Sequence, residues 1–525
     1  MPLIIPIKPT SPALPGGQVA VYNRNTNFTA YDPKFSSPYA ENFTFSVTRS
    51  LGRSMTLDVR YLGTLGKKRE GLLALNLPNV YYNKELWDAL DVTRRGEDAP
   101  LFDQMFAGLN VSGQTTGGYA AVGTVGPTGV LQRGSAHLRR NATFTSNIAI
   151  GNFDAVAGGI SSFQTVVPGL LSQPGGVNGR LLRNGCDRLA AGMTNIPTRC
   201  FPENYIVANP QLGAATYNSN LGSSNYHSLQ VQFNMRPVQG ISFQTTYGWA
   251  KTLGLIPQGY TDPLDRDADY TEAYLSVKHD LHTNGTFELP IGPNKLFMGN
   301  SSGLVARLVE RWQMSVIYNA FSGNPRTIIG GHMRYAAGTQ TLDRGQNRLD
   351  IVSPLFDNRM KGHAQWDGPN NDTGTYYGDK FTFVQDPQCA LTNKTDTMGF
   401  NLFANGSCTL NAIAMRNPDG TAGPIMLQNP LPGGVGNMPL SLRSLGKWRL
   451  DANLGKTFRI SESKSLSVRF DATNLLNHPD LSDSQPQTGQ SINTPGVVFG
   501  RIPDKGGQLT GSNPRRLQAQ LRFTF

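Results

Sequence analysis

The sequence predicts an all-β protein: an antiparallel transmembrane β-barrel, partial, with roughly a dozen strands and long extracellular loops. Three observations predict it. Apolar and polar residues alternate along several stretches, short turns alternate with long connections along the chain, and no run of eighteen apolar residues occurs. Such a run would be needed for a membrane-spanning helix, whereas a barrel strand needs apolar residues only on its outward face.

The composition agrees with strands joined by turns and loops. Of 525 residues only 16% are charged, 58 are glycine, and few stretches are rich in the Leu, Glu and Lys that build helices. The mean hydropathy of −0.32 resembles that of a soluble protein, but a barrel hides from such averages because only alternate residues face lipid.

The net charge of +11 comes from dispersed Lys and Arg residues, without a nucleic-acid-binding motif. We therefore expect no nucleic-acid partner; a cationic lumen, or loops facing anionic lipopolysaccharide, is favoured. The chain contains no His-Glu-x-x-His motif. It is predicted not to be an enzyme and to hold no cofactor.

The last ten residues, 516–525, show the alternation most fully. Leu517, Ala519, Leu521, Phe523 and Phe525 fall on one face, and polar residues fall on the other. At about 3.3 Å per residue and a tilt near 40°, ten residues cover roughly 25 Å, the height of the apolar band of an outer-membrane barrel. The edge strand of a soluble sandwich is the alternative, and recurrence upstream favours the barrel.

The same pattern recurs as hairpins along the chain. Alternating stretches occupy 43–61 and 229–249, each divided by a short turn. A strand over 281–289 is followed by a tight connection at 291–294, and the return strand is marked by residues 312–318. A last hairpin joins 450–458 to 466–472. A soluble sandwich gives no reason for short and long connections to alternate, but a membrane barrel does.

The domain organisation follows from these strands. Residues 1–38 are a Pro-rich, irregular lead-in, and residues 39–525 form the barrel portion, with long loops at about 64–225 and 323–440. Short helices are expected at 85–90 and 99–109, and small strands near 141–151. The first residues lack the basic region and the apolar core of a signal peptide, so we expect a fragment or a true start upstream.

Four cysteines fall as two local pairs, Cys186 with Cys200 and Cys389 with Cys408. Zinc sites favour tighter spacings, so two loop disulfides formed in an oxidising compartment are predicted.

Several stretches resemble the C-terminal half of TonB-dependent outer-membrane receptors, in the Oar-like group common in acidobacteria. The resembling stretches span much of the chain in a shared order and spacing: 37–63, 224–232, 242–251 with Tyr-Gly-Trp-Ala-Lys, 279–292, 470–479 with Phe-Asp-Ala-Thr-Asn-Leu-Leu-Asn-His-Pro, 499–502 and 514–516.

The resemblance implies a barrel around an N-terminal plug domain and import of a scarce ligand, an unidentified small molecule or oligomer, energised by the TonB complex. Neither a plug nor a TonB box is recognised, so the plug is expected to be supplied upstream or to be missing. The terminal Leu521, Phe523 and Phe525 resemble the sorting signal that the barrel-assembly machinery reads. The expected location is the bacterial outer membrane, in contact with its lipid and lipopolysaccharide.

Two sets of residues are site candidates. Charged residues on the polar faces of strands should face the lumen, contacting a plug or lining the pathway, unless they only pair with one another: Asp58, Arg60, Arg236, Glu288, Arg449, Asp451, Arg469, Asp471 and Arg522. Four aromatic residues should lie in the interface belts: Trp249, Trp312, Tyr318 and Trp448.

Metal binding is not predicted. His279 and His282 flank Asp280, but a spacing of three on a strand places the two rings on opposite faces. Asp265, Asp267 and Asp269 resemble the start of a calcium loop, yet the glycine and the glutamate that an EF-hand requires are missing. A solvated acidic loop is the simpler interpretation.

Three functions are therefore considered. The leading hypothesis is the barrel portion of a TonB-dependent receptor that takes up an unidentified ligand. The alternatives are a surface adhesion or structural outer-membrane protein without transport, and a secreted β-rich protein that binds polymers.

Overall fold

The structure of the protein is a computed structural model. It describes residues 28–107, 121–126, 129–141, 143–162, 201, 205–207, 215–238, 240–255, 270–273, 276–326, 328–330, 348–356, 365–368, 373–377, 380–395, 402–403, 408–434, 436–437, 442–478, 491–502 and 514–525.

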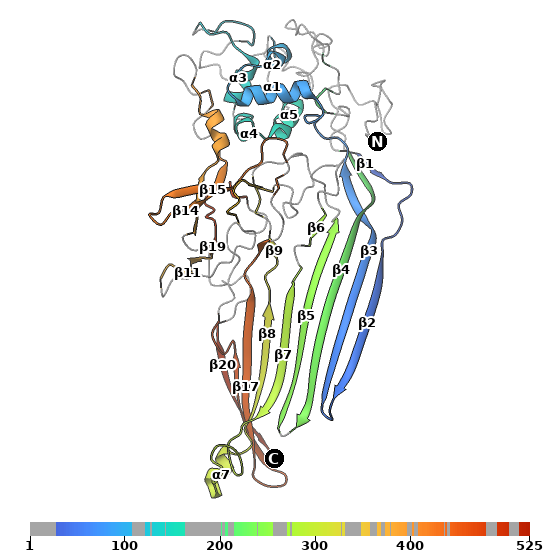
Figure 1. Cartoon of the computed structure of the whole chain (residues 1–525), viewed down its shortest axis with the longest axis vertical. Coiled ribbons are helices and arrows are strands. Elements are labelled where there is room, and N and C mark those ends of the chain that lie inside the picture. Colours follow the sequence, from blue (N-terminus) through green and yellow to red (C-terminus); the bar gives the residue numbers. More distant parts are fainter. Residues whose placement is uncertain are drawn as a thin grey trace.

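Nine long strands form one antiparallel sheet in the order β2-β3-β4-β5-β7-β8-β17-β18-β20 (Figure 1). Two short strands bring the sheet to eleven: β1 (Phe28–Tyr31) pairs in parallel with β4, and β6 (Tyr270–Glu272) pairs with β5. The long strands are β2 (Tyr39–Leu51), β3 (Met55–Ala74), β4 (Ala215–Val238), β5 (Ile241–Leu255), β7 (His279–Glu288), β8 (Gln313–Phe321), β17 (Lys447–Arg459), β18 (Ser465–Thr473) and β20 (Arg516–Thr524).

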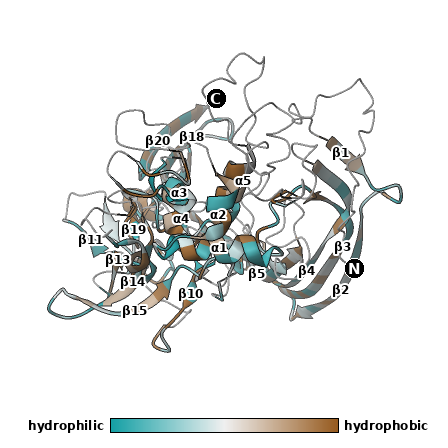
Figure 2. Cartoon of the chain, turned by 90° about the horizontal axis from the view of Figure 1, so that it is seen from above, coloured by the Kyte–Doolittle hydropathy of each residue, from teal (hydrophilic) through white to brown (hydrophobic). Residues whose placement is uncertain are grey.

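The register aligns the apolar residues of all nine strands on one face. Val47 lies opposite Val59, which in turn lies opposite Val231, and the same row continues to Tyr247 on β5. Figure 2 shows the alternation as teal and brown bands along β2, β3 and β4. This apolar face is not covered by a second layer: Phe45, Leu517 and Leu521 are 68%, 73% and 71% exposed. A sandwich would bury such a face, whereas an outer-membrane barrel turns it to lipid.

Connections differ between the two ends of the sheet. At one end short turns join β2 to β3, β4 to β5, and β17 to β18. Gly52 and Gly240 take φ of 76° and 80° there, values that glycine adopts without strain. At the other end lie the long connections 75–214, 256–278, 322–446 and 474–515, the arrangement of short periplasmic turns and long extracellular loops.

The sequence predicts a tight connection at 291–294 between β7 and β8, and this prediction is wrong for the hairpin as a whole. The chain turns there, but residues 289–312 form an elaborated segment that includes α7 (Gly303–Val309), and β8 starts only at Gln313. In Figure 1 α7 hangs below the strand ends. Alternation located both strands, but it carries no signal for a short helix inside a turn.

Within the first long loop the chain folds into a helical unit: α1 (Lys84–Arg94), α2 (Pro100–Met105), α3 (Gly134–Arg140), α4 (Thr145–Ile150) and α5 (Phe153–Ser162). The two predicted short helices are therefore confirmed as α1 and α2. The small strands expected near 141–151 are wrong, because residues 145–150 form α4, which buries Thr145, Ile148 and Ala149 at helical spacing.

The helical unit has its own hydrophobic core. Leu86, Leu90, Phe102 and Phe153 are fully buried in it. His137 lies between the rings of Phe106 and Phe144, at centroid distances of 5.6 and 5.5 Å. Burial lowers the pKa of His137 to about 3, so the ring is neutral at physiological pH and packs as an aromatic residue.

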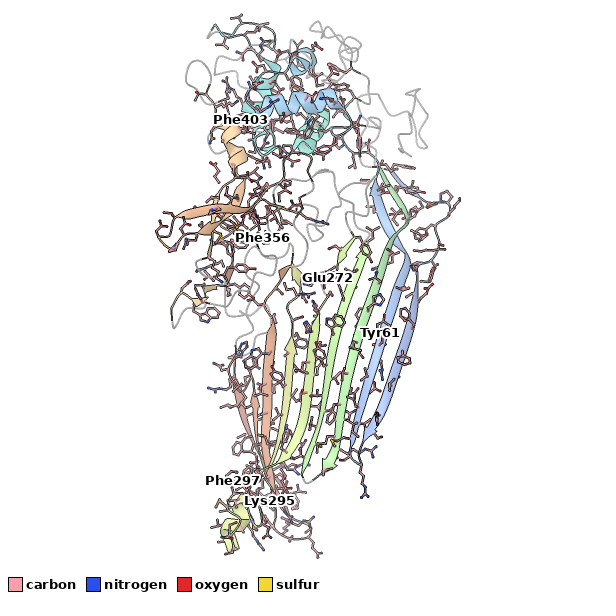
Figure 3. The ribbon with its side chains drawn as sticks, in the orientation of Figure 1. Tyr61, Glu272, Lys295, Phe297, Phe356 and Phe403 are labelled. Carbon is pink, nitrogen blue, oxygen red and sulfur yellow. A yellow bond between two sulfur atoms is a disulfide. The ribbon has the colours of Figure 1, made fainter. Side chains whose placement is uncertain are left out.

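A second unit, from the loop between β8 and β17, is the small sheet in the order β10-β15-β14-β13. Its core contains Ile413 and Leu427 together with Ile492 of the β18–β20 connection, and Phe499 of that connection stacks on Tyr377 at 5.0 Å. Figure 3 labels Phe356 beside this unit and Phe403 in the helical unit above it. The strands of the small sheet are β10 (Asp350–Ile351), β13 (Phe381–Gln385), β14 (Asn411–Arg416) and β15 (Ala422–Gln428).

The remaining elements are brief. They are the sheet β11-β12-β19, formed by β11 (Gln365–Trp366), β12 (Gly374–Thr375) and β19 (Arg501–Ile502), the pair β9 (Pro325–Arg326) and β16 (Leu442–Arg443), and the 3-10 helix η4 (Pro387–Thr392). Among the described residues none of the helices combines the length and the apolar character needed to cross a bilayer.

A buried polar network joins the helical unit to the small sheet; the two units together are called the loop assembly below. Asp386 is 1% exposed and accepts hydrogen bonds from the Gln388 and Asn429 amide nitrogens at 3.0 and 2.9 Å, and from Asn429 Nδ2 at 2.9 Å. Gln388 in turn accepts from Arg94 Nη2 at 3.2 Å and donates to the Asn429 carbonyl at 2.8 Å. The network therefore ties α1 and η4 to the end of β15.

The Cys389–Cys408 disulfide predicted from the sequence is present. Cys389 is fully buried and Cys408 is 8% exposed, and both lie in the core of the helical unit. The bridge therefore closes a loop within the β8–β17 connection, and both cysteines pack against the helices of the β3–β4 loop. Cys186 and Cys200 lie outside the described residues.

Replacing both Cys389 and Cys408 by alanine should destabilise the helical unit by about 3 kcal/mol. The disulfide joins residues that are 19 positions apart, and without it the unfolded chain gains conformational entropy. Limited proteolysis in rising urea should detect it as earlier cleavage within α1–α5, while cleavage of the long strands is unchanged. An unaltered urea midpoint for the helical unit would contradict this expectation.

Candidate functional site

The polar face of the long sheet gathers the charged residues predicted from the sequence. Asp58 lies opposite Gln232, which lies opposite Thr246, and that row reaches His282. Arg449 lies opposite Asn319, and Asp471 lies opposite Asn453. Because side chains alternate between the two faces along each strand, the register places all nine predicted charged residues on the same face: Asp58, Arg60, Arg236, Glu288, Arg449, Asp451, Arg469, Asp471 and Arg522. That this face lines a lumen stays a prediction.

Several of these charges pair within their own strands. Arg449 Nε lies 2.8 Å from Asp451 Oδ1, and Arg469 Nε lies 2.7 Å from Asp471 Oδ1. Both pairs join residues i and i+2, which share a strand face. The same spacing pairs Arg60 with Asp58 at 3.8 Å. The alternative considered in the sequence analysis, that these charged residues pair with one another, therefore occurs for these three pairs. Their charges largely compensate each other and do not create a strong electrostatic field.

An open cavity of about 420 Å³ lies on this polar face. It spans β4, β5, β7 and β8, and amide and hydroxyl side chains dominate its polar lining, which also includes Arg236. Donors and acceptors without strong net charge suit a hydrated, polar contact. The polar lining residues are Asn234, Arg236, Ser242, Gln244, Asn284, Thr286 and Ser315.

The His279, Asp280 and His282 cluster divides between the two faces, as the spacing predicts. His282 lies 2.7 Å from Asp280 and 2.7 Å from Asn319 on the polar face. His279 hydrogen-bonds Tyr247 at 2.7 Å on the apolar face. Within the described ranges no three His, Cys, Asp or Glu side chains gather at a distance that suits a metal ion. Asp265, Asp267 and Asp269 lie outside those ranges.

The predicted interface aromatics all lie on the apolar face. Trp448 is the second residue of β17, at the loop end, and its ring lies 6.2 Å from that of Tyr318, whereas Trp312 precedes β8 at the turn end. Trp249 is 49% exposed and lies opposite Leu229. These positions at both strand ends suit two belts, and the belt assignment stays a prediction.

Sequence reasoning missed two aromatic–histidine pairs on that same face. Tyr61 hydrogen-bonds His227 at 2.7 Å, and Tyr247 hydrogen-bonds His279 at the same distance. Figure 3 places Tyr61 on the outer strands of the sheet. Each pair brings together residues far apart in the sequence, so only the register reveals them. They satisfy polar groups that would otherwise meet lipid unpaired.

An ion pair at the loop end was also missed. Arg443 Nη2 pairs with Glu272, and Arg443 Nη1 donates to the carbonyls of Ser276 and Gly323 at 3.0 Å each. Figure 3 shows Glu272 above the strand ends. This contact ties the β5–β7, β8–β9 and β16 segments together beneath the loop assembly.

The terminal Leu521, Phe523 and Phe525 lie along the outer edge of the sheet. They are 71%, 52% and 90% exposed; Leu521 and Phe523 lie on the apolar face of β20, and Phe525 follows the strand. Seen from above, β2 and β20 lie well apart, and α1–α4 lie between them in projection (Figure 2). The loop assembly therefore stands over the concave side of the sheet.

A tall antiparallel sheet with a lipid-facing side, a polar side and long loops at one end defines a bacterial outer-membrane β-barrel protein. The chain belongs to the family described as "Outer membrane beta barrel domain", whose profile matches residues 4–518. The protein is located in the bacterial outer membrane.

Solved structures of similar proteins include the outer membrane transporter YddB from Escherichia coli, with 7% identity, 95% of this chain covered and a TM-score of 0.30. Another is the closed form of the ferric-catecholate import receptor Fiu from E. coli, with 8% identity, 93% of this chain covered and a TM-score of 0.21. The chain spans 34% of the YddB chain and 48% of the Fiu chain. No curated protein matches.

Proposed function

We propose that the chain is the C-terminal barrel portion of a TonB-dependent receptor that takes up a ligand across the outer membrane. The observation that carries this proposal is the polar face with its open cavity, which lies near the turn end of β4 and β5. Amides, hydroxyls and paired charges suit a hydrated pathway or the surface of a plug domain. The loop assembly would bind the ligand first, because it stands at the extracellular end.

The strand directions support a barrel larger than the described sheet. Every neighbouring pair among the nine long strands is antiparallel, so β2 and β20 run in the same direction. Antiparallel closure therefore requires an odd number of additional strands. A receptor barrel of about twenty-two strands has an even number of strands, so it would add about thirteen strands to these nine and meets this requirement. We infer that such strands complete the barrel.

The proposal is tested in the source bacterium. Strains that lack this gene, or that lack TonB, are compared for uptake of radiolabelled iron chelates, cobalamin and oligosaccharides. Uptake of at least one of these solutes should fall to background in both strains. Undiminished uptake of the whole panel, together with lost attachment to surfaces, would instead support the adhesion hypothesis, which the large loop assembly also suits.

A matched pair of variants tests whether the polar face is the pathway. Asn284 lines the cavity, whereas its neighbour Thr283 points to the apolar face and hydrogen-bonds Thr245 at 2.5 Å. Asn284→Trp should reduce uptake at least fivefold in the complemented deletion strain, because the indole fills the cavity. Thr283→Trp should reduce it far less, since lipid accommodates tryptophan. Equal uptake by the two variants would refute the pathway.

A further inference from the structure

The β7–β8 connection, residues 289–312, differs from every other described connection at its end of the sheet. The other three are short turns, whereas this one contains α7. Its backbone is internally hydrogen-bonded: Phe297 N donates to the Pro290 carbonyl at 2.9 Å, and Gly292 N donates to the Phe297 carbonyl at 2.9 Å. The connection is therefore a folded element and not an extended loop.

The connection packs on the lipid-facing side of the sheet. Lys456 on β17 lies opposite Val468, which places it in the apolar row. Its Nζ donates to the Arg307 carbonyl of α7 and lies 4.7 Å from the ring centroid of Phe458 and 6.0 Å from that of Trp312. Lys456 is only 6% exposed. The connection thus covers a lysine that would otherwise face the membrane, and it does so from outside the barrel wall.

Trp312 fixes α7 to the same side. Its Nε1 donates to the Leu308 carbonyl at 2.9 Å, and it precedes Met314, which lies in the apolar row opposite Phe287 and Leu454. The helix therefore continues the lipid-facing surface at the turn end of the strands.

The outer surface of the connection is both apolar and cationic. Leu296 and Leu304 are each 80% exposed, and Leu308, Phe297, Met298 and Val305 are 60%, 57%, 51% and 50% exposed. Arg307 and Arg311 are exposed among them, and the exposed Lys295 pairs with Glu288 at 3.6 Å. Figure 3 shows Lys295 and Phe297 together at the tip of the molecule. A water-soluble turn does not carry six large exposed apolar side chains within some fifteen residues.

We propose that residues 289–312 form an interfacial anchor seated in the periplasmic leaflet of the outer membrane. The apolar side chains of α7 and of 296–298 enter the acyl boundary, and Arg307 and Arg311 meet the phosphates of anionic phospholipids. Continuity with the lipid-facing sheet and the charge complementarity with phospholipid support a lipid occupant rather than a protein. The anchor requires only the outer-membrane location and does not depend on transport.

Photocrosslinking of the full chain in its own outer membrane tests the anchor. Leu304→p-benzoylphenylalanine should yield a phospholipid adduct, detected by mass spectrometry of the peptide. The matched control is Glu462→p-benzoylphenylalanine, in the exposed β17–β18 turn at the same end of the sheet; its lipid adduct should be at least fivefold less abundant. A protein adduct at Leu304, or equal lipid yields at both positions, would overturn the proposal.

A second experiment tests the charge. The Leu304→Trp variant of the full chain is reconstituted in vesicles of phosphatidylcholine, with or without a third of phosphatidylglycerol, that carry lipids brominated near the headgroup. Quenching of the added tryptophan should exceed that of the parent chain and should increase with phosphatidylglycerol. Adding Arg307→Glu and Arg311→Glu should abolish that increase. Quenching no greater than that of the parent chain would show that α7 stays in water and would refute the anchor.

Discussion

Replacing Phe233 by arginine is expected to keep the chain out of the outer membrane. Phe233 lies on the apolar face of β4, opposite Leu57 and Thr245, and its ring centroid is 5.4 Å from that of Phe243. A lipid-facing arginine near the bilayer midplane costs about 2–4 kcal/mol, and loss of the aromatic contact adds about 1 kcal/mol. The amount of chain that stays with outer membranes in high salt and needs detergent for extraction should fall severalfold.

The neighbouring residue supplies the control. Gln232 lies on the polar face, opposite Asp58 and Thr246, so Gln232→Arg adds the same charge where water reaches it. We expect that variant to accumulate in the outer membrane like the parent chain, and Phe233→Leu to lose little. If both arginine variants behaved alike, the assignment of the two faces would be wrong.

Replacing Asp386 by alanine is expected to unfold the junction between the helical unit and the small sheet. The carboxylate accepts from Gln388 N, Asn429 N and Asn429 Nδ2 within 3.0 Å. Its loss leaves these donors unpaired in a buried place, at about 1–3 kcal/mol for each. We expect a loss of about 4 kcal/mol in the unfolding free energy of the loop assembly, measured by hydrogen exchange of residues 380–395 and 408–434.

Asp419 is the matched control for Asp386. It also accepts a hydrogen bond from the amide two residues on, Thr421 N at 2.9 Å, but in an exposed turn. Asp419→Ala should therefore cost less than about 1 kcal/mol. Similar exchange in the two variants would show that the buried network contributes little to the junction.

The sheet was predictable because alternation is a local property of the sequence. Residues 43–61, 229–249, 450–472 and 517–525 each show one apolar and one polar face, and each forms long strands. Strand ends were less predictable: β3 continues to Ala74 and β4 begins at Ala215, where bulges interrupt the pattern. Lys456 in an apolar row also breaks the rule, and only the contact with α7 explains it.

The loops and the pairings between strands could not be read from the sequence. β17 pairs with β8 across the connection 322–446, and Tyr61 meets His227 only through the register of β3 and β4. The loop assembly depends on contacts between two loops, such as Arg94 with Gln388. Its helices α1 and α2 were predictable from local spacing, but the packing of η4 against them was not.

The unpaired edges of β2 and β20 bear on how the protein reaches its final location. Within the described residues, neither edge of the sheet has a neighbour along its outer side. Every amide and carbonyl that points outward there would lack a partner in hydrocarbon, at several kcal/mol for each group. The edges of β2 and β20 must therefore acquire hydrogen-bonding partners before, or while, the sheet enters the membrane. Closure of the barrel and its insertion into the membrane are then coupled in a single step of biogenesis.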